Sequence, residues 1–143
     1  MLALAHLPDI VSPEAEPDRA RLAFLRVVSA RSNCAARADL FQACAALSAD
    51  PVRAADTLAL ALFRGLSGLG GVPKLKLYQP AAPELSFDER WLLAALSAAE
   101  RDDTDSLAFL LRRRIPRHAQ RNIGFLLKAL ARAMAAEKFL ERV

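Results

Sequence analysis

The stretch DPVRAADTLALALFRGL, residues 50–66, carries the clearest folding signal in the chain. Its first two residues, Asp and Pro, are preferred as the cap that precedes an α-helix and as the first helical residue. The apolar residues after them recur every three or four positions, which places them within about 140° of the helix circumference. These residues are Val52, Ala55, Leu58, Ala59, Leu62, Phe63 and Leu66. The stretch therefore predicts an amphipathic helix with one side in a hydrophobic core.

The same spacing of apolar residues extends over most of the 143 residues. The helix expected after residue 86 is preceded by a capping box, because Ser86 is followed three positions later by Glu89. Only 5 residues are glycine and 6% are aromatic, whereas β-sandwiches and doubly wound sheets use more aromatic, β-branched and turn residues. We therefore predict an all-α protein of about six helices. The further helices are expected at about 15–31, 35–48, 87–101, 104–114 and 117–140.

A Gly- and Pro-rich stretch at about 67–85 divides the predicted helices into two groups. We predict a single all-helical domain over residues 1–143, with two three-helix halves at about 15–66 and 86–141 joined by this linker. Trp91 is expected near the junction of the halves. The predicted core includes Leu25, Val28, Phe41, Leu58, Leu62, Phe63, Trp91, Leu96, Leu110, Leu126 and Leu130.

Residues 65–74 contain four of the five glycines and superficially resemble a phosphate-binding loop. A phosphate-binding loop follows a strand and leads into a helix, whose N-terminal amide groups meet the anion. This stretch follows a predicted helix and leads into prolines instead. We interpret it as a helix end and a linker.

Residues 74–78, KLKLY, alternate polar and apolar side chains as a β-strand does. A buried strand needs a partner for its backbone groups, and no second convincing strand pattern follows. The segment is therefore either an extended loop over the core or a strand that pairs with a second copy across a two-fold axis. Lys74 and Lys76 are the kind of charges that protect an exposed strand edge.

The charges are unevenly distributed along the chain, although the net charge is only +4. Residues 84–105 hold seven acids and two arginines, whereas residues 112–132 hold seven basic residues and no acid. Within the predicted helix at 117–140, four cations fall within about 60° of one another and extend over about 22 Å of the helix axis. These cations are the candidate binding residues: Arg117, Arg121, Lys128 and Arg132.

A row of cations on one helix face suits the phosphate backbone of a nucleic acid, an acidic protein or an anionic membrane surface. It is also typical of an ordinary solvated face, and the acidic stretch at 84–105 offers a partner that would neutralise it. Only Phe125 lies near the row, so stacking on single-stranded bases is not supported. A helix-turn-helix over residues 87–114 is disfavoured, because its second helix would begin with acids.

Residue types that carry catalysis or bind metals are few. The two cysteines, Cys34 and Cys44, and the two histidines, His6 and His118, lack the spacing of a disulfide framework or a zinc site. Asp56 has no polar partner at helical spacing. No nucleophile or cofactor motif is present. We therefore predict no catalytic, metal-binding or cofactor-binding residues, no cofactor and no small-molecule substrate.

No apolar run reaches membrane-spanning length, and the N-terminal residues do not match the pattern of a secretory signal. These features predict a cytoplasmic protein, and the bias toward Ala, Arg and Leu suggests a bacterial source. The function expected from the sequence is that of a non-enzymatic helical interaction or regulatory module. It would self-associate as a homodimer or bind an acidic protein. The alternative is a nucleic-acid-binding protein that uses the four cations at Arg117, Arg121, Lys128 and Arg132.

Overall fold

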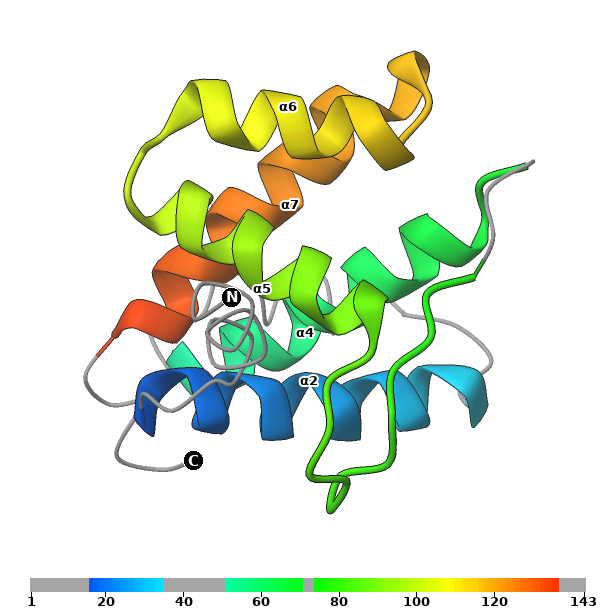
Figure 1. Ribbon diagram of the computed structural model, residues 1–143, viewed down its shortest axis with the longest axis vertical. Helices are drawn as coiled ribbons and strands as arrows, with labels where there is room; N and C mark the ends of the chain where they lie inside the picture. Colours follow the sequence, from blue (N-terminus) through cyan, green and yellow to red (C-terminus); the bar gives the residue numbers. More distant parts are fainter. Residues whose placement is uncertain (1–15, 35–50, 71–73, 137–143) are drawn as a thin grey trace, which may run out of the picture.

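The computed structural model describes residues 16–34, 51–70 and 74–136 of the chain. Within these residues the protein is all-helical, which confirms the predicted fold class for this part of the chain. The helix expected at about 35–48 lies outside the described residues. The described helices are α2 (Glu16–Cys34), α4 (Pro51–Ser67), α5 (Phe87–Glu100), α6 (Thr104–Arg114) and α7 (Arg117–Ala135) (Figure 1).

The helix starts agree closely with the local signals in the sequence. At α5 both bonds of the capping box are present: the Glu89 N–H donates to Ser86 Oγ over 3.0 Å, and the Ser86 N–H donates to the Glu89 carboxylate over 2.8 Å. At α6 the Asp103 carboxylate accepts a hydrogen bond from the Ser106 N–H. These caps satisfy backbone donors that have no partner inside the helix.

Two helix ends differ from the prediction. The helix α2 continues through Ser32, where a break was expected, and ends at Cys34. The Ser32 hydroxyl donates to the Ser29 carbonyl over 2.7 Å, so it bonds inside the helix instead of competing with it. The helix α7 ends at Ala135, and residues 137–140 of the predicted helix lie outside the described residues.

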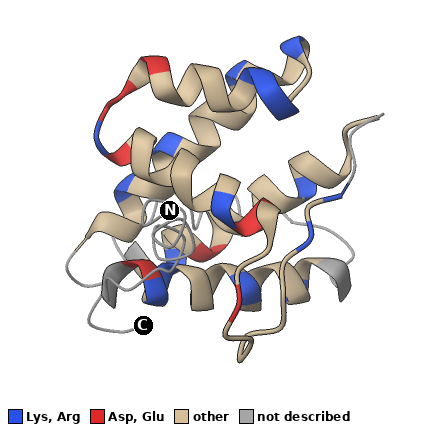
Figure 2. Ribbon diagram, in the orientation of Figure 1, with Lys and Arg blue, Asp and Glu red and all other residues tan. Residues whose placement is uncertain are grey.

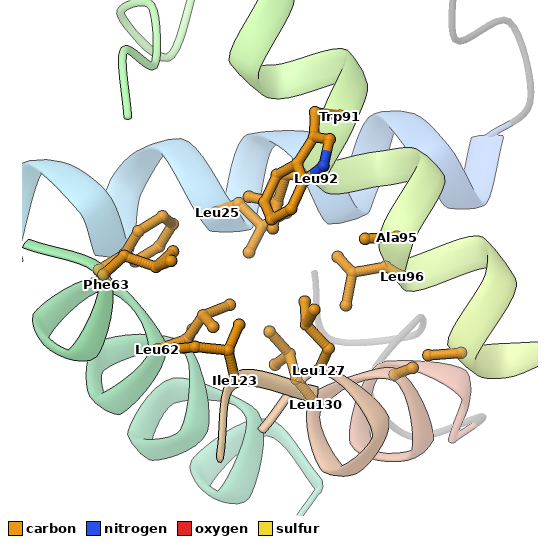
Figure 3. Packing of buried hydrophobic residues seen from close by; sticks show 14 of the residues in the cluster. Leu25, Leu62, Phe63, Trp91, Leu92, Ala95, Leu96, Ile123, Leu127 and Leu130 are labelled. Atoms are coloured by element: carbon orange, nitrogen blue, oxygen red, sulfur yellow. The ribbon is translucent and has the colours of Figure 1, made fainter. Parts of the chain in front are cut away.

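One hydrophobic cluster contains residues from all five described helices. Figure 3 labels members of it from α2, α4, α5 and α7. Most of the predicted core residues are buried in it: Leu25, Val28, Leu62, Phe63, Trp91, Leu96 and Leu130. Three others, Leu58, Leu110 and Leu126, are only half-buried and pack against its edge, whereas Phe41 lies outside the described residues. Burial of this apolar surface is the main force that holds the helices together.

The predicted division into two three-helix halves is not confirmed. The most extensive helix contact joins α4, from the expected first half, to α7, from the expected second half. Their surfaces approach closely, because a Cβ atom on Gly65 of α4 would lie 3.4 Å from Ile123 Cδ1 of α7. The apolar sides of these two helices meet directly, so the core extends across both groups of helices.

Trp91 is buried as expected, with 6% of its surface exposed. Its indole N–H donates to the Leu110 carbonyl of α6 over 3.0 Å, and the Arg114 guanidinium lies 5.5 Å from its ring. Both of these contacts lie within the second group of helices, so they give no support to the expected position at a junction of halves.

Residues 74–79 run as an extended segment beside the start of α5 (Figure 1). Leu75 and Leu77 pack against the core, and the lysines that alternate with them are exposed. The Lys76 N–H donates to the Asp88 carboxylate over 2.7 Å, and the Tyr78 N–H donates to the Glu89 carboxylate over 3.0 Å. Side chains of α5 therefore take the place of a neighbouring strand, which supports the extended-loop alternative.

A buried ion pair fixes this loop to α2. Arg26 and Glu89 are 4% and 0% exposed, and two hydrogen bonds of 2.7 and 3.1 Å join the guanidinium to the carboxylate. Arg26 also donates to the carbonyls of Ala82 and Glu84 over 2.8 and 2.6 Å. The sequence prediction assigned Glu89 only to the helix cap and gave Arg26 no role.

The protonation state of Glu89 follows from these contacts. Burial raises the pKa of its carboxyl group, but the hydrogen bonds from Arg26, Ser86 and Tyr78 lower it further than burial raises it. The net effect is a pKa below the ordinary value of glutamate. The carboxylate is therefore the stable form in the folded protein.

Candidate interaction surface

The helix α7 places apolar and charged residues on opposite sides. Its inner side packs into the core through Ala119, Ile123, Gly124, Leu127, Leu130, Ala131 and Met134. Gly124 allows a close approach to α6, since a Cβ atom there would lie 3.2 Å from Leu111 Cδ1. The position of the inner side fixes the direction in which the opposite side faces.

The four predicted binding residues lie on that opposite side, and all of them are exposed. We call Arg117, Arg121, Lys128 and Arg132 the basic face. Figure 2 colours the lysine and arginine positions of the ribbon blue. Helical geometry spreads these residues over about 22 Å of the axis. None of them forms an ion pair with any residue that the structure describes. The structure therefore brings the predicted residues together and leaves their charges open to solvent within the described part of the chain.

The acidic stretch at 84–105 does not neutralise the basic face among the described residues. Glu89 pairs with Arg26, and Glu100 pairs with Arg21 over 2.6 Å, so two of its acids bind α2. Asp88 pairs with Arg114 at the end of α6, and Asp103 pairs locally with Arg101. The sequence left open whether the acids at 84–105 pair with the basic face. In the structure these four acids pair with other arginines instead.

Asp103 also shows how local the remaining acidic contacts are. The side-chain hydrogen bond from Ser106, together with the Ser106 N–H and Arg101, lowers the pKa of the Asp103 carboxyl group. These partners all lie within three positions of Asp103 in the sequence. The acid therefore stabilises the start of its own helix.

Four large apolar side chains are strongly exposed among the described residues: Val27, Phe87, Phe109 and Phe125. Two of the phenylalanines have a guanidinium over the ring, since Arg114 lies 5.7 Å from Phe87 and Arg113 lies 5.6 Å from Phe109. Phe125 is 65% exposed, and no cation of the described residues stacks on its ring.

Phe125 borders the basic face. It lies one turn after Arg121 and three positions before Lys128, about 20° outside the row of cations at 100° per residue. The sequence prediction considered Phe125 only as a base-stacking residue and did not include it in the site. Its position on the solvent side of the helix was readable from the 3.6-residue period.

Other charged residues singled out by the sequence have structural contacts. Asp56, for which no partner was found at helical spacing, pairs with Arg31 of α2. Arg114 of the basic stretch is half-buried beside Asp88, whereas Arg112 and Arg113 are exposed at the end of α6. Exposed cations therefore lie both at the end of α6 and along α7.

The described residues contain no group of three or more His, Cys, Asp or Glu side chains that would hold a metal ion. His118 is exposed on the first turn of α7. The side chains of Cys34, Cys44 and His6 are not among those that the structure describes. No described helix combines the length and the apolar character that a membrane crossing requires.

Comparisons of the chain with known protein families, curated proteins and solved structures found no match.

Proposed function

We propose that the protein is a non-enzymatic helical interaction module that docks an acidic protein partner on the basic face and Phe125. The observation that carries the proposal is the combination on one helix side of four exposed, unpaired cations and a phenylalanine without a stacked cation among the described residues. We propose further that such docking serves regulation. The cytoplasmic location and the bacterial source stay predictions from the sequence.

Protein interfaces typically concentrate their binding energy in a few aromatic and arginine side chains, with polar residues around them. Phe125 offers the apolar anchor, and Arg121 and Lys128 lie within one turn of it on either side. The length of the basic face, about 22 Å, corresponds to about 15 residues of a partner helix. An acidic amphipathic helix would match both the charge and the apolar anchor of this surface.

Nucleic-acid binding is the second candidate function, and the row of unpaired cations favours it. A row without any acid on α7 suits the phosphates of a duplex, whose neutralisation makes binding strongly salt-dependent. Phosphate contacts do not need an exposed phenylalanine. Phe125 therefore gives the acidic protein partner the stronger support.

The two functions are distinguished by fluorescence anisotropy at low salt with two labelled probes. One probe is a helical peptide with glutamate on one side and leucine on the other, and the second probe is a DNA duplex. Docking of an acidic protein predicts that Phe125→Ala weakens peptide binding by roughly 30-fold, which is the loss expected for an interface hot spot. Duplex binding that is tighter than peptide binding and unaffected by Phe125→Ala would favour the nucleic-acid function instead.

A matched control removes the same charge elsewhere. Arg53 of α4 and Arg90 of α5 are exposed. The double variant Arg53→Ala/Arg90→Ala removes two cations, so it has the same net charge as Arg121→Ala/Lys128→Ala. The proposal predicts that only the second pair weakens peptide binding. Failure of the wild-type protein to bind either probe at low salt would overturn both functions.

A further inference from the structure

A groove lies on another surface of the molecule, between α5 and α6. Its volume is about 620 Å³, and it is open to solvent. Ala94, Ala98 and Leu110 give it apolar walls, and the half-exposed ring of Phe109 lines it as well. A cavity of about 150 Å³ already accepts benzene, so the groove has room for the ring of an aromatic side chain.

One acidic and one basic side chain line the groove. Asp105 lines the groove and is exposed, and it forms no ion pair with a described residue. Arg101 also lines it but is held by Asp103 over 3.3 Å and by Ser97 over 2.6 Å. Of the four acids at residues 100–105, Glu100 and Asp103 pair with Arg21 and Arg101, so Asp102 and Asp105 are the two without an ion pair among the described residues.

We infer that this groove receives Phe125 from a second copy of the chain, so that the protein associates with itself through α7 of one copy and the α5–α6 groove of another. The inference rests on the proposed function, because it uses the same surface of α7. Arg121 and Lys128, on either side of Phe125, would then meet the two unpaired acids, Asp102 and Asp105. Charge of opposite sign on the two surfaces favours this partner and this orientation.

Association with other copies of the chain covers both the α7 surface and the α5–α6 groove. Among the exposed phenylalanines of the described residues, Phe125 is the one without a stacked cation, and the groove is an apolar depression with the unpaired Asp105 in its lining. Packing of Phe125 in the groove removes its ring and the apolar walls of the groove from water. Burial of apolar surface is the main source of favourable free energy in protein association. The lysine-bearing segment at 74–78 has no role in this arrangement.

The two surfaces differ, so the contact between copies is heterologous. Each copy offers one α7 surface and one groove, and the assembly either closes into a ring or grows with concentration. The same geometry makes self-association and docking of an acidic partner mutually exclusive at α7.

The test is sedimentation velocity on two variants, alone and mixed. The α7 variant is Phe125→Ala/Lys128→Glu, and the groove variant is Ala94→Lys/Asp105→Lys; all four positions are exposed, so circular dichroism should show the wild-type fold. We expect the wild-type protein to self-associate with increasing concentration and each variant to stay monomeric. An equimolar mixture should form dimers and nothing larger, because each variant retains one intact surface.

A wild-type protein that is monomeric at high micromolar concentration would overturn the inference, as would self-association of either variant or a mixture that stays monomeric. Anisotropy with the acidic peptide separates this failure from that of the proposed function. The groove variant keeps the α7 surface and should bind the peptide at least as tightly as the wild type does, because no second copy competes for α7. Peptide binding by a strictly monomeric wild-type protein would leave the docking function standing and remove only the self-association.

Discussion

Arginine serves opposite purposes at the start of α5 and along α7. Beside α5, Arg26 is buried and paired, and it uses its donors to hold Glu89 and the loop carbonyls. Along α7, Arg117, Arg121 and Arg132 are exposed and have no acidic partner among the described residues. The difference teaches that the charge of this protein divides into a part that stabilises the fold and a part that stays available to a partner.

The largest effect is expected at the buried pair. Glu89→Ala leaves the Arg26 guanidinium buried without its counter-charge and removes the acceptor of the Tyr78 and Ser86 N–H groups. Loss of one member of a buried pair costs about 3–5 kcal/mol in the free energy of unfolding. Chemical denaturation measures this loss, and a loss within experimental error would contradict the structural role of the pair.

The pH dependence of stability sharpens the same point. The pKa of Glu89 is lower in the folded protein than its ordinary value of 4.5, so the unfolded chain takes up the proton first as the pH falls. The contribution of the ion pair is therefore fully present above pH 4.5 and is lost as the pH falls through the lowered folded value. Denaturation curves at several acidic pH values should show this decline, and Glu89→Gln should make it shallower. An equal slope in wild type and Glu89→Gln would show that other carboxyl groups cause the decline.

A moderate effect of opposite sign is expected at the α5–α6 turn. Asp102 has a φ of 55°, in the left-handed region that favours glycine. Asp102→Gly removes the strain on the Cβ atom and should raise the free energy of unfolding by about 0.5–1 kcal/mol. Thermal unfolding measures the gain, and a lower melting temperature would show that the Asp102 side chain contributes more than its backbone costs.

The smallest effect on stability is expected at the basic face. Exposed residues away from packing contacts change the free energy of unfolding by about 0.5 kcal/mol or less. Arg121→Ala/Lys128→Ala should therefore unfold at nearly the same denaturant concentration as the wild type. A decrease in the free energy of unfolding comparable to that of Glu89→Ala would show that these cations stabilise the fold, as Arg26 does.

Local signals made much of the helix pattern predictable. Asp50 with Pro51, Ser86 with Glu89, and Pro116 mark the starts of α4, α5 and α7, because caps and prolines act on the neighbouring backbone alone. The basic face was predictable for the same reason, since the helical period fixes which residues of one helix share a side.

Long-range contacts were not predictable. Arg26 and Glu89 are 63 positions apart, and no pattern in either segment selects one as the partner of the other. The apolar side of α7 fits the side of α4 only through its three-dimensional packing, so the sequence suggested two separate halves. Phe125 was overlooked as an anchor because the cations stacked on Phe87 and Phe109, which distinguish those rings from Phe125, are seen only in the structure.

The central claim is that the exposed cations of α7 bind a partner, while equally exposed cations elsewhere do not. Its most direct test is the affinity of Arg121→Ala/Lys128→Ala for the acidic amphipathic peptide, relative to that of Arg53→Ala/Arg90→Ala, at equal net charge. We expect at least about tenfold weaker binding by the α7 variant and near wild-type binding by the control. Equal affinities of the two variants would contradict it.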